Sequence, residues 1–241
     1  MSERIIRFLL TSAAGGEIGS RLAALAEEIP GGVDIGYGVR DERASPAGTQ
    51  HGAALGDSPL LFDAYVEYRE RDGGESGEGD FGRLTTVATD AMGRMAPWID
   101  ATSSSIIVGH RHVLMPRRAP FMMIFALSPP PGMGQDGFLG HWRDRHGPMV
   151  VEAARGKGSY YQLHGDTVRT AALADVLGIG GLRLSGHAGG WMRDPEMLTR
   201  SLAVPSALVA LEDERLFIDH SRSSMGVYRV DYDSEAIAAT G

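Results

Sequence analysis

Residues 105–127 read SIIVGHRHVLMPRRAPFMMIFAL, and this stretch indicates where one structural unit ends and another begins. Residues 105–114 and 121–127 are rich in β-branched, aromatic and other apolar side chains, which is typical of strands. Between them stand Pro116 and two arginines, a polar joint of the kind that separates elements. The stretch therefore predicts two strands that belong to different halves of the chain.

The sequence before this joint predicts strand, helix, strand, strand, helix and strand, in that order. Strands are expected at 4–11, 32–40, 60–68 and 105–114, and helices at 20–29 and 81–95. The strand predictions rest on alternating apolar residues and the helix predictions on apolar residues at helical spacing. The segment 41–59 is rich in Gly, Ala, Ser and Pro and is expected to be a surface loop. This order is that of the ferredoxin-like, or split βαβ, unit.

The same order begins again after the joint. Strands are expected at 121–127, 159–165, 182–192 and 225–232, and helical segments at 135–154, 167–177, 195–202 and 206–211. The helix at 167–177 has no counterpart in the first half. The predicted fold class is α+β, with two tandem ferredoxin-like repeats over residues 1–116 and 117–241. Their bare sheet faces are expected to pack sheet to sheet as a barrel whose interior holds a ligand.

Composition narrows the classes of function. The 241 residues are 43% hydrophobic, enough for a substantial core. With 31 acidic and 23 basic side chains the net charge is −8, and no basic cluster suits nucleic acid. No apolar run reaches the roughly 20 residues of a membrane span, and the start lacks the features of a signal peptide. We therefore expect neither nucleic acid nor membrane as a partner, and a cytoplasmic location.

The chemistry open to the chain is limited by what it lacks. It has no cysteine, which excludes disulfides, thiolate nucleophiles and cysteine-ligated metals. The motifs GxGxxG, GxxxxGK[ST] and GxSxG do not occur in a suitable context. Acid–base chemistry by histidine, with no cofactor and no metal, is what we expect.

The motif GFLGHWRDRHGPMVV at 137–151 places Phe138, Trp142 and His146 on one inward stripe of the expected helix. Pro148 lacks an N–H, and Gly147 before it is biased away from helical geometry, so the helix should kink or break beside His146. Such a break can aim the imidazole at a cavity. The alternative is that the ring only satisfies a freed backbone group.

Two motifs carry a resemblance to a known family. Residues 137–151 resemble the first signature of the EthD family, and residues 185–223, SGHAGGWMRDPEMLTRSLAVPSALVALEDERLFIDHSRS, resemble its second. The similarity covers roughly residues 120–232. It implies a dimeric α/β-barrel fold, here as a tandem pair in one chain. Relatives by fold include cofactor-free monooxygenases, polyketide cyclases, isomerases and decarboxylases that act on aromatic compounds.

The function expected from these observations is a cofactor-independent lyase, a decarboxylase of a phenolic or other aromatic carboxylate. His146 is expected as the general acid/base and His164 as its partner or as the group that orients the phenol. Substrate contacts are expected from Trp142, Arg7, Tyr65, His110, His112 and His187. Within this set, either Arg7 or the pair His110 and His112 is expected to hold the substrate carboxylate. His220 is expected at the surface, and His51 receives no role.

Several alternatives stay open. His110 and His112 lie on one strand face and would chelate a metal if His164 converged on them. The strand face of Arg7 and Tyr65 could instead face solvent. The reaction could be that of an isomerase, a cyclase or a cofactor-free monooxygenase on an aromatic or polyketide-like substrate. The protein could also bind small aromatic molecules without turnover. One chain can close its own barrel, and the pairing of two chains into a homodimer is a further alternative.

Overall fold

The computed structural model describes residues 2–13, 17–28, 32–44, 46, 49–55, 61–71, 81–116, 118–154, 158–181 and 184–234. The strands are β1 (Ser2–Leu10), β2 (Asp34–Arg40), β3 (Ala64–Arg71), β4 (Ser105–Met115), β5 (Phe121–Leu127), β6 (Tyr160–Gly165), β7 (Gly186–Met192) and β8 (Ser224–Asp233). The helices are α1 (Ile18–Glu27), α2 (Gln50–Leu55), α3 (Gly82–Met95), α4 (Gln135–His141), α5 (Gly147–Ala154), α6 (Thr167–Leu177), α7 (Met197–Leu202) and α8 (Pro205–Glu214). A π-helical turn, Trp142–His146, joins α4 to α5.

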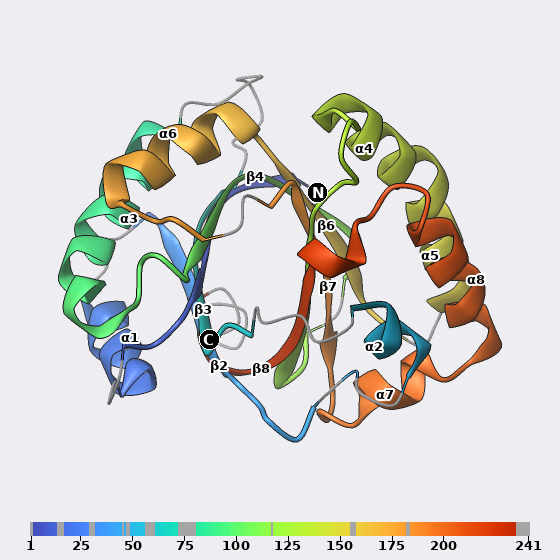
Figure 1. The fold of residues 1–241 in the computed structure, drawn as a ribbon. Coiled ribbons are helices and arrows are strands. Elements are labelled where there is room, and N and C mark those ends of the chain that lie inside the picture. The colour runs from blue at the N-terminus through green and yellow to red at the C-terminus, as the bar shows by residue number, and fades with distance from the viewer. Residues whose placement is uncertain are drawn as a thin grey trace.

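Within the described residues, eight antiparallel strands form one closed barrel (Figure 1). Their order is β1-β3-β2-β8-β5-β7-β6-β4, so each half contributes four neighbouring strands, and both halves use the same internal order. The bare faces of the halves lie opposite each other across the barrel, and edge strands close it through the pairs β2–β8 and β4–β6. The α+β class and the barrel are confirmed.

The two seams between the halves are built alike. Each contains a register shift, between Tyr37 and Gly38 in β2 and between Val113 and Met115 in β4. Such bulges increase strand bending and help a sheet to close. Each seam also has a glycine, Gly38 or Gly109, whose missing Cβ makes room for a backbone carbonyl of the neighbouring strand.

The helices cover the outside of the barrel, and the halves exchange one helix each. In Figure 1, α1, α3 and α6 lie on one side, and α2, α4, α5, α7 and α8 lie on the other. Helix α6 comes from the second half but packs on β4 and α3 of the first. Helix α2 comes from the first half but contacts the short 3-10 helix His220–Arg222 of the second. The expectation that helix 167–177 has no counterpart in the first half is therefore wrong. Helix α2 follows the second strand of the first half, as α6 follows the second strand of the second half.

Charged side chains lie inside the barrel beside a cluster of apolar and aromatic ones. Ile6 and Phe8 of β1 belong to the core under α1 and α3, so Arg7 between them points inward. Its Nε and Nη2 donate to Glu67 Oε2 at 2.9 and 2.5 Å. Arg69 and Arg111 each donate to Glu67 Oε1 at 3.0 Å. Arg7, Glu67 and Arg111 are buried, so an ion network occupies this part of the barrel interior, where the sequence predicts a ligand site.

Two other expectations need correction. The segment 41–59 was expected to be a surface loop, but it contains α2, whose His51 and Leu55 are buried. Helix 135–154 does not break at Pro148, because it continues through a π-helical turn in which the Gly147 N–H donates to the Trp142 carbonyl. No helix in the described ranges has both the length and the apolar character needed to cross a membrane.

Candidate functional site

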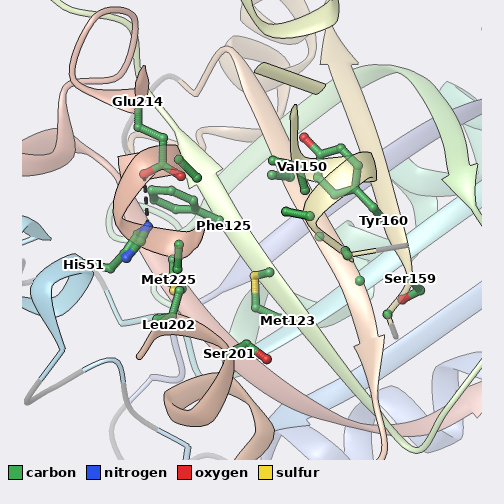
Figure 2. A pocket seen from close by; sticks show the side chains of 18 of the residues that line it. His51, Met123, Phe125, Val150, Ser159, Tyr160, Ser201, Leu202, Glu214 and Met225 are labelled. Atoms are coloured by element: carbon green, nitrogen blue, oxygen red, sulfur yellow. Dashed lines mark ion pairs between the residues drawn. The ribbon is translucent and has the colours of Figure 1, made fainter. Parts of the chain in front are cut away.

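A pocket with a volume of about 530 Å³ lies outside the barrel, between the sheet of the second half and the helices that cover it. This volume is within the range of roughly 300–1,000 Å³ that is usual for small-molecule sites. The lining comes from β5, β6, β7, α5, α7 and α8, and also from α2 of the first half. Figure 2 shows His51 and Glu214 together on one side, with Val150, Ser159 and Tyr160 on the other.

Apolar side chains form most of the pocket wall. Alternation along β5 decides which of them face it: Met123, Phe125 and Leu127 point outward to the pocket, whereas Met122 and Ile124 point into the barrel. The helices add methionines and small residues, among them Met149 and Ala207. A wall of this kind suits an apolar ligand, and methionine side chains can adapt to its shape.

The hydrogen-bonded pair that borders the pocket is His146 with Asp213. His146 ends the π-helical turn, and Asp213 lies in the last turn of α8. His146 Nδ1 is 3.0 Å from Asp213 Oδ2, and His141 Nε2 is 3.1 Å from the same oxygen. Arg145 Nε lies 3.0 Å from Asp213 Oδ1. Because a carboxylate only accepts, we assign the proton of His146 to Nδ1, which leaves a lone pair on Nε2.

Glu214 is the second buried carboxylate of the site and links three histidines. Its Oε2 lies 3.0 Å from His220 Nε2 and 3.6 Å from His51 Nε2, and its Oε1 lies 3.8 Å from His146 Nε2. His220 was expected at the surface but is buried, so that expectation is wrong. Asp213 therefore binds His141 and His146, whereas Glu214 lies beside His146, His51 and His220. The two carboxylates join these histidines into one cluster.

Burial and hydrogen bonding set the charges of this cluster. Burial lowers the pKa of His146 below its ordinary value, although Glu214 and Asp213 oppose the shift. Burial alone would raise the pKa of Glu214, but the hydrogen bonds from His220 and His51 outweigh it and lower the pKa to about 2. Asp213 likewise has a lowered pKa: burial raises it, and the hydrogen bonds from His141 and His146 more than compensate. Near neutral pH, His146 is therefore neutral and both carboxylates are ionised.

This arrangement can remove a proton from a bound molecule. A neutral imidazole with an unprotonated Nε2 is a base, and Asp213 stabilises the imidazolium that forms when it accepts the proton. The ring is held in place by Phe217, whose centroid is 5.1 Å from that of His146. The anion that is left behind would lie against the mostly apolar wall of the pocket.

The structure separates the residues expected from the sequence into three groups. Trp142 and His146 line the pocket. His110, His112 and His164 lie on the outer strand face at the β4–β6 seam, where the rings of His112 and His164 are 4.5 Å apart. The pKa of His164 is lowered to about 3, chiefly by burial and then by His112. None of these three histidines lines the described pocket.

The third group lies inside the barrel. Arg7, Tyr65 and His187 are buried there, with exposures of 0%, 1% and 0%. Arg7 is held by Glu67 and by the Tyr161 hydroxyl, 3.0 Å from its Nη1. The pKa of His187 is well below its ordinary value, because of burial and then the charge of Arg7. Arg7, one of the groups expected to hold a substrate carboxylate, therefore lies on the far side of the sheet from the pocket.

Sequence reasoning missed the acidic partners and His51. The run Glu212-Asp213-Glu214 ends α8, where negative charge is unfavourable because of the helix dipole. That local conflict was the available signal, since such conflicts concentrate at functional sites. His51 gave no signal, because only the packing of α2 brings it to the pocket. Across the described ranges, no group of three His, Asp or Glu side chains has an arrangement that could hold a metal ion.

Comparisons with known proteins show the fold. No protein-family model matches the sequence, and no curated protein matches it. A crystal structure of a proposed monooxygenase from Lactobacillus acidophilus NCFM is 14% identical, with a TM-score of 0.50, over 97% of this chain and 96% of that one. Another proposed monooxygenase, from Fusobacterium nucleatum subsp. nucleatum, is 9% identical, with a TM-score of 0.50, over 96% and 93%. At these identities the similarity concerns the fold alone.

Proposed function

We propose that this protein is an oxygenase that uses O2 and no resident cofactor to oxidise a hydroxylated aromatic substrate in the outer pocket. The observation that carries the proposal is the His146–Asp213 pair at the border of a large apolar pocket. The names of the two solved structures with this fold add support, because both are proposed monooxygenases.

The geometry supports a reaction in which atoms and electrons balance. His146 Nε2 takes a proton from the substrate, so that an electron-rich aromatic anion forms in the pocket. This anion reduces O2. One oxygen atom becomes a carbonyl oxygen at a ring carbon that loses its single hydrogen, and the deprotonated hydroxyl becomes a second carbonyl. The other oxygen atom leaves as water with the ring hydrogen and the hydroxyl proton. The substrate supplies the two electron pairs that reduce O2. The Asp213 carboxylate stabilises the transient imidazolium of His146.

The decarboxylase expected from the sequence has less support. It needs a cation to hold the substrate carboxylate, but Arg7 lies inside the barrel and His110 and His112 lie at the seam. Arg200 borders the pocket, yet Asp194 binds it at 2.7 and 2.9 Å, and Glu214 adds negative charge. A phenol without a carboxylate suits this pocket better.

The fold proposal is the one expected from the sequence, a tandem pair of ferredoxin-like units over residues 1–116 and 117–241, similar to the EthD family. The shared strand order of the two halves supports it. A homodimer remains a prediction, and sedimentation of the full chain decides it.

The decisive experiment incubates the full chain with a panel of hydroxylated polycyclic aromatics, each with and without a ring carboxylate, and follows oxygen uptake and product mass. Gain of oxygen supports the oxygenase, loss of CO2 supports the decarboxylase, and an unchanged mass indicates an isomerase or cyclase. His146→Gln should lower the rate by roughly 10²-fold or more. His110→Gln is the matched control, since His110 lies outside the pocket. Turnover by His146→Gln at the rate of the unmodified protein would exclude this residue as the base.

A further inference from the structure

Tyr160 lies on the wall of the pocket, close to the helix that carries the proposed base. It is the first residue of β6, and Tyr161 after it belongs to the cluster inside the barrel, so strand alternation turns Tyr160 outward to the pocket. Figure 2 shows it across the pocket from Glu214. Its hydroxyl oxygen is 3.0 Å from Trp142 Nε1, and Trp142 stands about one helical turn before His146. Tyr160 and the imidazole therefore border the same part of the pocket.

The hydroxyl of Tyr160 has a proton that no described residue accepts. Its oxygen accepts two hydrogen bonds, from Trp142 Nε1 at 3.0 Å and from Gln162 Nε2 at 3.1 Å. An indole N–H only donates. The Gln162 amide is oriented by the Trp142 carbonyl, to which the same Nε2 donates at 3.2 Å, so it is a donor as well. Because buried polar groups nearly always have partners, a spare proton on a pocket-lining hydroxyl indicates a position for an oxygen of the ligand.

The surroundings keep this hydroxyl protonated and polarise it. Burial raises the pKa of Tyr160 to about 12, and the hydrogen bonds from Gln162 and Trp142 oppose the rise. At neutral pH the group is therefore a phenol with a proton to share. The two N–H groups that donate to its oxygen strengthen it as a donor, because hydrogen bonds in a chain polarise one another.

The proposed reaction creates a need for such a donor. When His146 Nε2 takes a proton from the substrate, the substrate oxygen is left with a negative charge. The Glu214 carboxylate lies 3.8 Å from that Nε2, and Asp213 adds a second negative charge on the other side of the imidazole. Both carboxylates disfavour an anion at this position, and the imidazolium offsets only part of their effect. A neutral donor beside the substrate oxygen stabilises the anion without adding charge.

We propose that Tyr160 donates a hydrogen bond to the oxygen of the bound substrate and stabilises it as an oxyanion once His146 has taken its proton. The proton of Tyr160 stays on the phenol throughout, and its hydrogen bond strengthens as charge develops on the substrate. Trp142 and Gln162 are positioning residues, which fix and polarise the hydroxyl. This inference rests on the proposed function and adds a second catalytic group to the same pocket.

The ionisation of a bound probe tests this role without turnover. The neutral and ionised forms of 4-nitrophenol absorb light differently, so a pH titration of absorbance gives the pKa of the bound molecule. The full chain is titrated in excess over the probe and without oxygen. Tyr160→Phe keeps the ring and removes the hydroxyl. It should raise the pKa of bound 4-nitrophenol by about 1, because the ionised probe loses a stronger hydrogen bond than the neutral one.

Two further variants serve as controls. Tyr68 is also buried, its hydroxyl has no hydrogen-bond partner among the described residues, and it lies in the core under α3, away from the pocket. Tyr68→Phe should therefore leave the pKa of the bound probe unchanged. Ala188→Phe fills the pocket and should abolish the signal of the bound probe, which places the probe there. Circular dichroism checks that each variant is folded.

An unchanged pKa of the bound probe in Tyr160→Phe overturns the inference, as does the absence of probe binding by the unmodified protein. If Tyr160→Phe does not fold, a crystal structure of the unmodified protein with 4-nitrophenol decides. A probe oxygen within about 3 Å of the Tyr160 hydroxyl supports the inference, and a probe oxygen bound elsewhere overturns it. A raised pKa in Tyr160→Phe without oxygen uptake by the unmodified protein would remove the proposed oxygenase and leave the donor role of Tyr160 standing. Oxygen uptake with an unchanged pKa would do the reverse.

Discussion

Replacing Glu67 by Gln tests how far the barrel depends on its internal charges. One carboxylate, 1% exposed, receives hydrogen bonds from Arg7, Arg69 and Arg111. Burial would raise the pKa of Glu67, but the three guanidinium groups outweigh it and hold the pKa well below its usual range. Gln keeps the shape, removes the charge and turns an N–H donor toward arginine donors.

The cost follows from the uncompensated positive charge. Removing one partner of a buried ion pair typically lowers the free energy of unfolding by about 3–5 kcal/mol. For a chain of this size, each kcal/mol changes the melting temperature by about 2–4 °C, so a decrease of about 10 °C is expected. Thermal melting followed by circular dichroism measures it.

The exposed pair of Glu28 with Arg94 supplies the matched control. Glu28 is 60% exposed, so Glu28→Gln removes an equivalent charge from a surface pair. It should change the free energy of unfolding by at most about 1 kcal/mol. If Glu67→Gln melts within about 2 °C of the unmodified protein, the internal network does not contribute as argued, and water or rearrangement must replace the lost carboxylate.

Three further predictions concern the site and the seam. Asp213→Asn should lower kcat by about 10²–10⁴-fold with little change in fold, because His146 loses the carboxylate that fixes its tautomer. Steady-state kinetics with a substrate that the unmodified protein turns over measures this effect. An undiminished kcat would contradict the prediction. His164 has a folded-state pKa of about 3, below its unfolded value, so stability should fall as pH drops below about 6.5. Denaturant titrations from pH 7 to 4 should show a shallower loss for His164→Gln, and parallel curves would refute the assignment. Ala188→Phe should fill the pocket and abolish binding of a hydroxylated polycyclic aromatic with the fold intact, and unchanged affinity would place the ligand elsewhere.

The candidate site was predictable only in its local part. The spacing of Trp142 and His146 in GFLGHWRDRHGPMVV placed both on one helical stripe beside a glycine and a proline, and both line the pocket. Their acidic partners were not found, because Asp213 lies 67 positions further along the chain. No periodicity in the sequence relates such distant positions.

The sequence by itself determined the order and nature of most elements. Alternation in 121–127 and the helix stop at Gly178 are local properties, set by side-chain period and by the left-handed conformation that glycine adopts, with φ of 65°. What only the tertiary structure decided was which strand face meets water, charge or ligand. Arg7 and Met123 both lie on alternating strands, yet closure of the barrel sends one inward to Glu67 and the other outward to the pocket. Closure depends on pairing between β2 and β8 and between β4 and β6, contacts between halves that local patterns do not specify.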